Sequence, residues 1–155
     1  MLEKYMRVAL EQARKAEKKD EVPIGAIIVK DDKVIAKAYN KMEKTQRATA
    51  HAEILCIEKA CKKLKSWRLD DCVMFSTLEP CPMCAGAIVN ARISKVVFGA
   101  YEPKSGSAES KFKVLTDSGL NHKTEFVGGV LQEDCSSIIK NYFKYKRKEK
   151  TLTNE

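Results

Sequence analysis

A short part of the chain, residues 49–88, combines an imidazole, a carboxylate and two thiols. His-Ala-Glu occupies positions 51–53, and Pro-Cys-Pro-Met-Cys follows at 80–84. One histidine and a Cys-x-x-Cys pair form the ligand set of catalytic zinc sites that leave the fourth position to water. A closed structural site would need His122 or one of the scattered cysteines, and His122 has no ligand-like neighbour. The pattern favours an open zinc site made of His51, Cys81 and Cys84, over a structural zinc site or a redox pair.

Glu53 would turn such a zinc site into an enzyme. It stands one residue from His51, near the ion without binding it. Zinc lowers the pKa of bound water to roughly 7, and a nearby carboxylate can take up and pass on the proton. Without the ligands, Glu53 would be an ordinary helix residue.

Helix starts are expected to position these groups. Thr49 is a good N-cap residue, which predicts that His51 lies in the first turn of a helix. Cys81 is expected at the cap of the next helix, with Pro82 in its first position and Cys84 in its first turn. The positive end of a helix dipole favours thiolate over thiol, so two helix starts can converge on one cation.

The spacing of apolar residues predicts the helices and strands around these groups. Strands are expected at 22–30, 34–40, 72–77, 95–100 and 125–130, with a hairpin turn at 31–33. Helices are expected at 2–16, 49–65, 82–90, near Phe112 and at 133–148. Helices that alternate with strands after a hairpin predict an α/β fold, a three-layer α/β/α domain around a five-stranded mixed sheet. The first two strands are expected to be antiparallel and the last three parallel, in one domain spanning residues 1–155.

Charge and composition limit the partners and the compartment. The 155 residues carry a formal net charge of +8 and have a pI near 9.2, which favours a polyanionic partner. The basic and aromatic segment KNYFKYKRKEK at 140–150 lies within a basic C-terminal helix or tail at about 133–150. The N-terminus has no apolar signal segment, and no run is long enough to span a membrane. A cytoplasmic protein with reduced cysteines is expected.

At this point the sequence resembles the zinc-dependent cytidine and deoxycytidylate deaminase superfamily, whose signature is H-x-E followed by P-C-x-x-C. Within it, the chain is most similar to the bacterial tRNA-specific adenosine deaminases. The segments that carry the resemblance are EVPIGAIIV, TAHAEI, TLEPCPMCAGAIVNARI, VVFGA, GLNHK and GGVL, together with the aromatic and basic tail. They extend over nearly the whole chain and imply the cytidine-deaminase-like fold.

The resemblance implies hydrolytic deamination of adenosine to inosine at the wobble position of tRNA. One zinc ion per subunit would be held by His51, Cys81 and Cys84. Zinc hydroxide would attack C6 of adenine while Glu53 shuttles protons to N1 and to the departing ammonia. Asn40 matches the position that bonds the target nucleoside, and the Ala52 N–H would help to hold the base. A tRNA anticodon stem-loop and a second identical subunit are the implied partners.

Other substrate contacts implied by the resemblance are less direct. Glu102 falls where relatives commonly carry an aspartate near a flanking ribose. Lys146 and Arg147 are expected to contact phosphates, because they close the basic run and need no partner in the fold. Tyr142 and Phe143 could stack on bases or pack in the core. Arg47-Ala48 replaces the Asp-Pro common in relatives and could reshape the loop beside the site.

Two other functions share these motifs. A deaminase of guanine, cytosine or deoxycytidylate would use the same metal site but would have no need of a cationic, aromatic tail. A zinc-stabilised RNA-binding module would need the metal and the basic surface but not Glu53. The tail and the whole-chain resemblance favour the RNA deaminase.

Overall fold

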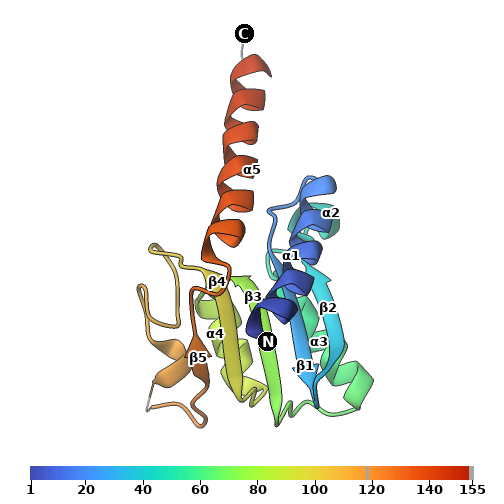
Figure 1. Ribbon diagram of the computed structural model, residues 1–155, viewed down its shortest axis with the longest axis vertical. Helices are drawn as coiled ribbons and strands as arrows, with labels where there is room; N and C mark the ends of the chain where they lie inside the picture. Colours follow the sequence, from blue (N-terminus) through green and yellow to red (C-terminus); the bar gives the residue numbers. More distant parts are fainter. Residues whose placement is uncertain (118, 154–155) are drawn as a thin grey trace.

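The computed structural model describes residues 1–117 and 119–153, and its elements alternate between helices and strands (Figure 1). The elements in chain order are α1 (Leu2–Lys18), β1 (Gly25–Lys30), β2 (Lys33–Tyr39), α2 (Met42–Thr45), α3 (Ala52–Leu64), β3 (Cys72–Leu78), α4 (Pro82–Asn90), β4 (Lys95–Ala100), the 3-10 helix η1 (Val114–Thr116), β5 (Glu125–Val127) and α5 (Gln132–Thr153). None of the described helices is both long and apolar enough to cross a membrane.

The five strands form one sheet in the order β2-β1-β3-β4-β5. β1 is antiparallel to both β2 and β3, whereas β3, β4 and β5 are parallel to one another. At the hairpin, Asp31 and Asp32 have φ values of 51° and 61°, a left-handed pair that matches the twist of the flanking strands. The predicted mixed sheet, with its antiparallel start and parallel end, is confirmed.

Helices cover both faces of the sheet, which confirms the three-layer α/β/α prediction. α1 packs on β1 and β3, and the beginning of α5 packs on β4, around Met6, Leu10, Ile27, Phe75 and Cys135. α3 and α4 lie on the other face, around Ile28, Cys56, Met74, Ile88 and Phe98. Alternate residues of each central strand therefore enter opposite cores, as the pleat of a strand requires.

The boundaries agree with the sequence analysis where local signals are strong. The helix at 82–90 and the strand at 95–100 are confirmed to the residue. The last strand ends at Val127 rather than residue 130, α5 continues to Thr153, and the helix expected near Phe112 is the 3-10 turn η1. In Figure 1, α5 starts beside the sheet and then extends well beyond it.

The predicted cap at Thr49 is wrong. Helix α3 begins at Ala52, and His51 itself is the N-cap residue, with extended backbone angles (φ −74°, ψ 149°). The His51 N–H donates to the Thr49 carbonyl at 2.8 Å, so a tight turn precedes the helix. Asn40, from the end of β2, supplies the capping oxygen and accepts the Ala52 N–H at 2.7 Å. A residue distant in sequence therefore replaces the local cap.

Candidate active site

The three predicted ligands meet at the starts of α3 and α4. His51 Nδ1 lies 3.6 Å from Cys81 Sγ and 3.4 Å from Cys84 Sγ. Tetrahedral zinc, with bonds of ~2.1 Å to nitrogen and ~2.3 Å to sulfur, holds these two atom types about 3.6 Å apart. Among the described residues, this is the only group of three or more potential ligands within such reach. The donor set therefore fits one zinc ion.

The local helix structure explains why the thiols converge. Cys81 caps α4 and its Sγ accepts the Cys84 N–H at 3.5 Å, while Pro82 occupies the first turn. The hydrogen bond from the Cys84 side chain, and then the one from His51, lower the pKa of Cys81 to about 4 against the opposing effect of burial. The bond to Cys81, together with burial, raises the pKa of Cys84. A thiolate is thus stabilised at the helix start, as a metal ligand requires.

Glu53 is buried beside these ligands, with 4% of its surface exposed. Burial raises its pKa to about 7, and the nearby Cys81 adds to the rise. Its own backbone N–H, the charge of His51 and the Cys84 thiol act in the opposite direction. A carboxyl group with this pKa can both accept and release a proton at neutral pH.

Asn40 and Ala52 are joined to each other in this structure. Asn40 is buried, and its Oδ1 accepts the Ala52 N–H. The N–H that was predicted to help hold a base is therefore already bonded. No described residue accepts a hydrogen bond from Asn40 Nδ2, so this amide remains the polar group that Asn40 can offer to a ligand.

A second buried glutamate, Glu79, organises the loop beside the ligands. Its Oε2 accepts the backbone N–H groups of Ala108, Glu109 and Ser110 at 3.1, 2.9 and 3.0 Å. Its Oε1 accepts the Glu102 N–H at 3.1 Å and the Ser110 hydroxyl. One carboxylate therefore ties together a loop that spans residues 102–110.

The same loop is attached to the chain just before Cys81. The Ser107 N–H donates to the Pro80 carbonyl at 2.8 Å. Gly106 packs against the Glu79 carboxylate so closely that a Cβ at this position would collide with Oε1. Sequence reasoning missed Glu79, and the available signal was a carboxylate directly before the Pro-Cys ligand motif.

Comparison with known proteins agrees with this geometry. Residues 2–147 match the MafB19-like deaminase family. The chain belongs to this deaminase family. It is 49% identical over 148 residues to the tRNA-specific adenosine deaminase of Bacillus subtilis, covering 96% of this chain and 92% of that protein.

Solved structures of other deaminases have the same fold. A structure from a study of A-to-I editing by tRNA:A34 deaminases is 41% identical with a TM-score of 0.83, covering 86% of this chain and 96% of that one. The guanine deaminase of Bacillus subtilis is 39% identical with a TM-score of 0.63, covering 71% of this chain and 69% of that one. The lower score and coverage make the guanine deaminase the more distant neighbour.

In this deaminase, Glu102 lies at the start of the loop that Glu79 organises. Its side-chain Oε1 accepts the Lys104 N–H at 3.0 Å, so the carboxylate folds back on its own loop. The side chain is partly exposed. The structure therefore brings Glu102 to the Glu79 side of the site and gives its carboxylate a local role.

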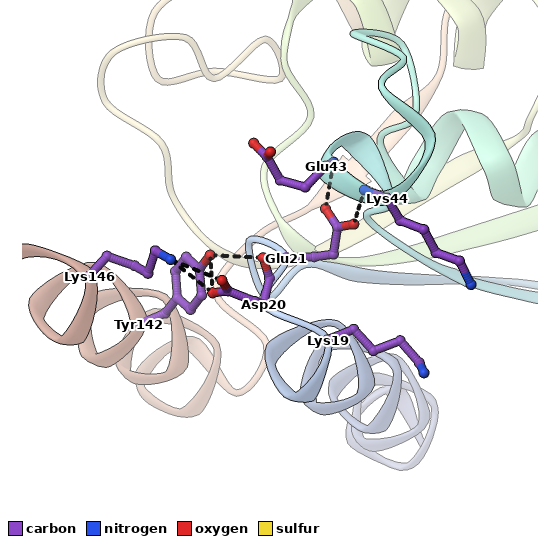
Figure 2. A pocket seen from close by; sticks show the side chains of 7 residues that line it. All are labelled: Lys19, Asp20, Glu21, Glu43, Lys44, Tyr142 and Lys146. Carbon is purple, nitrogen blue, oxygen red and sulfur yellow. Dashed lines mark hydrogen bonds and ion pairs between the residues drawn. The ribbon is translucent and has the colours of Figure 1, made fainter. Parts of the chain in front are cut away.

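The expectation that Lys146 needs no partner in the deaminase fold is wrong. Its Nζ lies 3.0 Å from Asp20 Oδ2 and 3.5 Å from Glu149 Oε2. Figure 2 shows that Tyr142 joins the same contact, because its hydroxyl donates to the Asp20 carbonyl and carboxylate. These bonds fasten α5 to the end of α1 beside a cavity of about 470 Å³.

Tyr142 and Phe143, each expected either to pack in the core or to stack on bases, differ in their exposure in the deaminase. Tyr142 is buried, whereas 43% of the Phe143 side chain is exposed. Arg147 is exposed on the projecting part of α5, where it lines a hollow of about 550 Å³ with Lys144, Lys148 and Leu152. Core packing therefore describes Tyr142, whereas Phe143 and Arg147 are among the exposed residues of α5.

Proposed function

We propose that this protein is a zinc-dependent hydrolase that converts adenosine to inosine at the wobble position of tRNA. The observation that carries the proposal is the placement of buried Glu53 next to a three-ligand set, His51, Cys81 and Cys84, with zinc-like separations. Such a set leaves one coordination position for a reactant. The extensive identity to tRNA-specific adenosine deaminases supports the choice of substrate.

The residues around the ligands supply the proton chemistry. A bound zinc ion would supply water activation at neutral pH. Glu53 accepts the proton that this activation releases and delivers it to N1 of adenine. It then takes the proton of the hydroxyl group added at C6 and passes it to the amine, which leaves as ammonia while the C6 oxygen becomes the carbonyl of inosine. The pKa of about 7 caused by burial makes both uptake and release possible. Ammonia and inosine are the products.

Further side chains are assigned to substrate binding. Asn40 offers Nδ2 to the target nucleoside while its Oδ1 fixes the first N–H of α3. Glu102 stands on the anchored loop where a flanking nucleotide would pass. Arg147 contacts phosphate from α5, and the ion pair of Lys146 with Asp20 holds that helix in place.

The experiment that tests this function uses an anticodon stem-loop with adenosine at the wobble position. Incubation with the purified protein, nucleoside digestion and mass analysis should yield inosine, with little reaction of free guanine or deoxycytidylate. The rate should fall when zinc is removed by a chelator and return when zinc is added. Turnover of guanine or deoxycytidylate with an unaltered stem-loop would support the small-molecule deaminase instead.

We also propose a homodimer that uses the outer surface of α4. Gly86 lies inside this helix, and a Cβ built on it would have no atom within 4 Å. Glycine inside a helix costs roughly 0.5–1 kcal/mol relative to alanine, and no described neighbour requires it. Exposed Met83 and Leu120 flank this surface, which includes a hollow of about 230 Å³. Close approach of a second copy would account for both features.

The dimer has a direct test in sedimentation velocity. Gly86→Leu should shift the protein toward monomer, whereas Gly119→Ala, outside this helix, should not. Equal sedimentation of wild type and Gly86→Leu as monomers would contradict the proposed dimer. We further propose that residues 1–155 act as one domain in the cytoplasm, where its six free cysteines stay reduced.

A further inference from the structure

A cationic hollow lies along α3, next to the segment that leads from α2 to His51. It has a volume of about 350 Å³ and is bounded by the α2 segment, the loop after it and one face of α3. Four cationic side chains line it, Lys41, Arg47, Lys59 and Lys62, against one acidic side chain, Glu58. Leu55 is its aliphatic member.

The positive charges of this hollow are not held in ion pairs by the part of the chain that the structure describes. Across residues 1–117 and 119–153, none of the four cations forms an ion pair, and Glu58 does not pair with any of them. Lys59 Nζ donates only to the Lys37 carbonyl, at 2.7 Å. Lys41 Nζ lies 5.0 Å from the centre of the Tyr39 ring. In the basic tail, by contrast, Lys146 is held by Asp20.

Crowding of positive charge is also visible at Lys59. Burial lowers the pKa of Lys59, and the charges of Lys41, Lys15 and Lys37 lower it further. Like charges are thus held close together at a cost, and an anion in the hollow would relieve that cost.

Backbone hydrogen bonds connect the hollow to the active site. The Lys41 N–H donates to the Ala50 carbonyl at 3.0 Å, directly before His51, and Lys41 follows Asn40 in sequence. The Leu55 N–H donates to the His51 carbonyl at 3.0 Å, so the hollow begins one helical turn, about 5.4 Å, from a metal ligand. An extended strand that places one nucleotide in the site can reach this surface with a neighbouring phosphate.

We propose that the hollow formed by Lys41, Arg47, Lys59 and Lys62 binds backbone phosphate of the RNA substrate beside the reacting nucleotide. The proposal rests on the proposed function and adds a contact surface to it. Excess positive charge and a single aliphatic group favour a polyanion over an apolar protein surface.

The test compares two lysines on the same helix. Lys62 lines the hollow, whereas Lys63 is equally exposed on α3 and does not. The double variant Arg47→Ala/Lys62→Ala and the control Lys63→Ala are titrated with the wobble-adenosine stem-loop from 50 to 300 mM salt. Each lost phosphate contact should reduce the slope of log K against log salt by about 0.7–0.9. The slope should fall by about twice that in the double variant and stay unchanged in Lys63→Ala.

The outcomes separate this inference from the proposed function. A slope change in Lys63→Ala that is half as large as that in the double variant would mean that only overall charge matters, and would overturn the phosphate site. Unchanged RNA binding with a shift in sedimentation would overturn it in favour of a subunit contact. Absence of inosine with the wild-type protein would instead contradict the proposed function, whatever the salt slopes.

Discussion

Two glutamates of this protein are almost equally buried and yet differ in their proton affinity. Glu53 and Glu79 expose 4% and 1% of their surface, and each stands two residues from a metal ligand, His51 or Cys81. Burial raises the pKa of Glu53 to about 7. Burial also raises the pKa of Glu79, but hydrogen bonds from the loop overcome it and hold that pKa below its usual value.

The donors around each carboxylate contribute to this difference. Glu79 accepts four backbone N–H groups and one hydroxyl. Glu53 has its own backbone N–H, the Cys84 thiol and the charge of His51, which do not compensate for burial. Hydrogen bonds to the charged form favour it, and loss of water disfavours it.

The comparison shows how burial and hydrogen bonding give one residue type two different proton affinities. A carboxylate that moves protons must be incompletely solvated, so that both protonation states are accessible near neutral pH. A carboxylate that anchors a loop must be saturated with donors, so that its charge persists and its bonds stay formed. Glu53 fits the first description and Glu79 the second.

The largest predicted effect is that of Glu53→Gln. Loss of the proton carrier should lower kcat for the stem-loop by roughly 10²–10⁴-fold, while KM changes little. The isosteric amide removes a charge that burial disfavours, so the unfolding temperature and the zinc content should be retained. Kinetics, thermal unfolding and elemental analysis measure the three quantities.

Full deaminase activity of Glu53→Gln would contradict the proton-transfer role of Glu53. Glu11→Gln is the control, because Glu11 is exposed on α1 and does not line the proposed phosphate-binding hollow. This control should react at the wild-type rate.

Glu79→Gln should have the opposite profile. The carboxylate of Glu79 accepts five donors, and the glutamine amide has only one oxygen that can accept. Each buried donor left unsatisfied costs about 1–3 kcal/mol. We expect the free energy of unfolding to fall by about 3 kcal/mol, and KM for the stem-loop to rise as the loop at 102–110 loosens, with a smaller change in kcat. Urea unfolding and steady-state kinetics measure these effects.

The effect of Glu79→Gln on stability should depend on pH. The pKa of Glu79 is lowered in the folded protein, so its stabilising contribution is present above the ordinary glutamate pKa and is lost as pH falls through the folded value. The stability difference between wild type and Glu79→Gln should therefore shrink in acid. A large loss of kcat with unchanged stability would instead place Glu79 in the chemistry.

The sequence predicts much of this site because its main signals are local. The ligand motif at 81–84 lies at the start of a helix whose bounds, 82–90, follow from Pro82 and the apolar residues after it. Alternating and β-branched residues likewise locate the strand at 95–100. The metal ligands and the helix that positions two of them are therefore visible without a structure.

Features that depend on distant partners were not predictable in this way. The cap of α3 comes from Asn40 rather than Thr49, and the donors to Glu79 lie 23–31 residues later in the chain. Asp20 and Lys146 are 126 residues apart, so no local pattern reveals that this lysine is paired. The fold creates these contacts, and each changes the availability of a polar group.

Ser110→Ala is expected to have a smaller effect than Glu53→Gln or Glu79→Gln. It removes one donor to Glu79, the Ser110 hydroxyl, and leaves the four backbone N–H groups in place. A net hydrogen bond to a charged group contributes roughly 1.5–3 kcal/mol, and the remaining donors should limit the loss to about 1 kcal/mol.

Ser105→Ala is the matched control for Ser110→Ala, because Ser105 lies in the same loop and its side chain makes no bond to Glu79. Urea unfolding of both variants should show a loss for Ser110→Ala only, with KM for the stem-loop within about twofold of wild type. If Ser110→Ala destabilised the protein as much as Glu79→Gln, the anchor would depend on one hydroxyl rather than on shared backbone donors. The contrast with Glu53 would then rest on a single bond, because saturation by many donors is what keeps Glu79 charged.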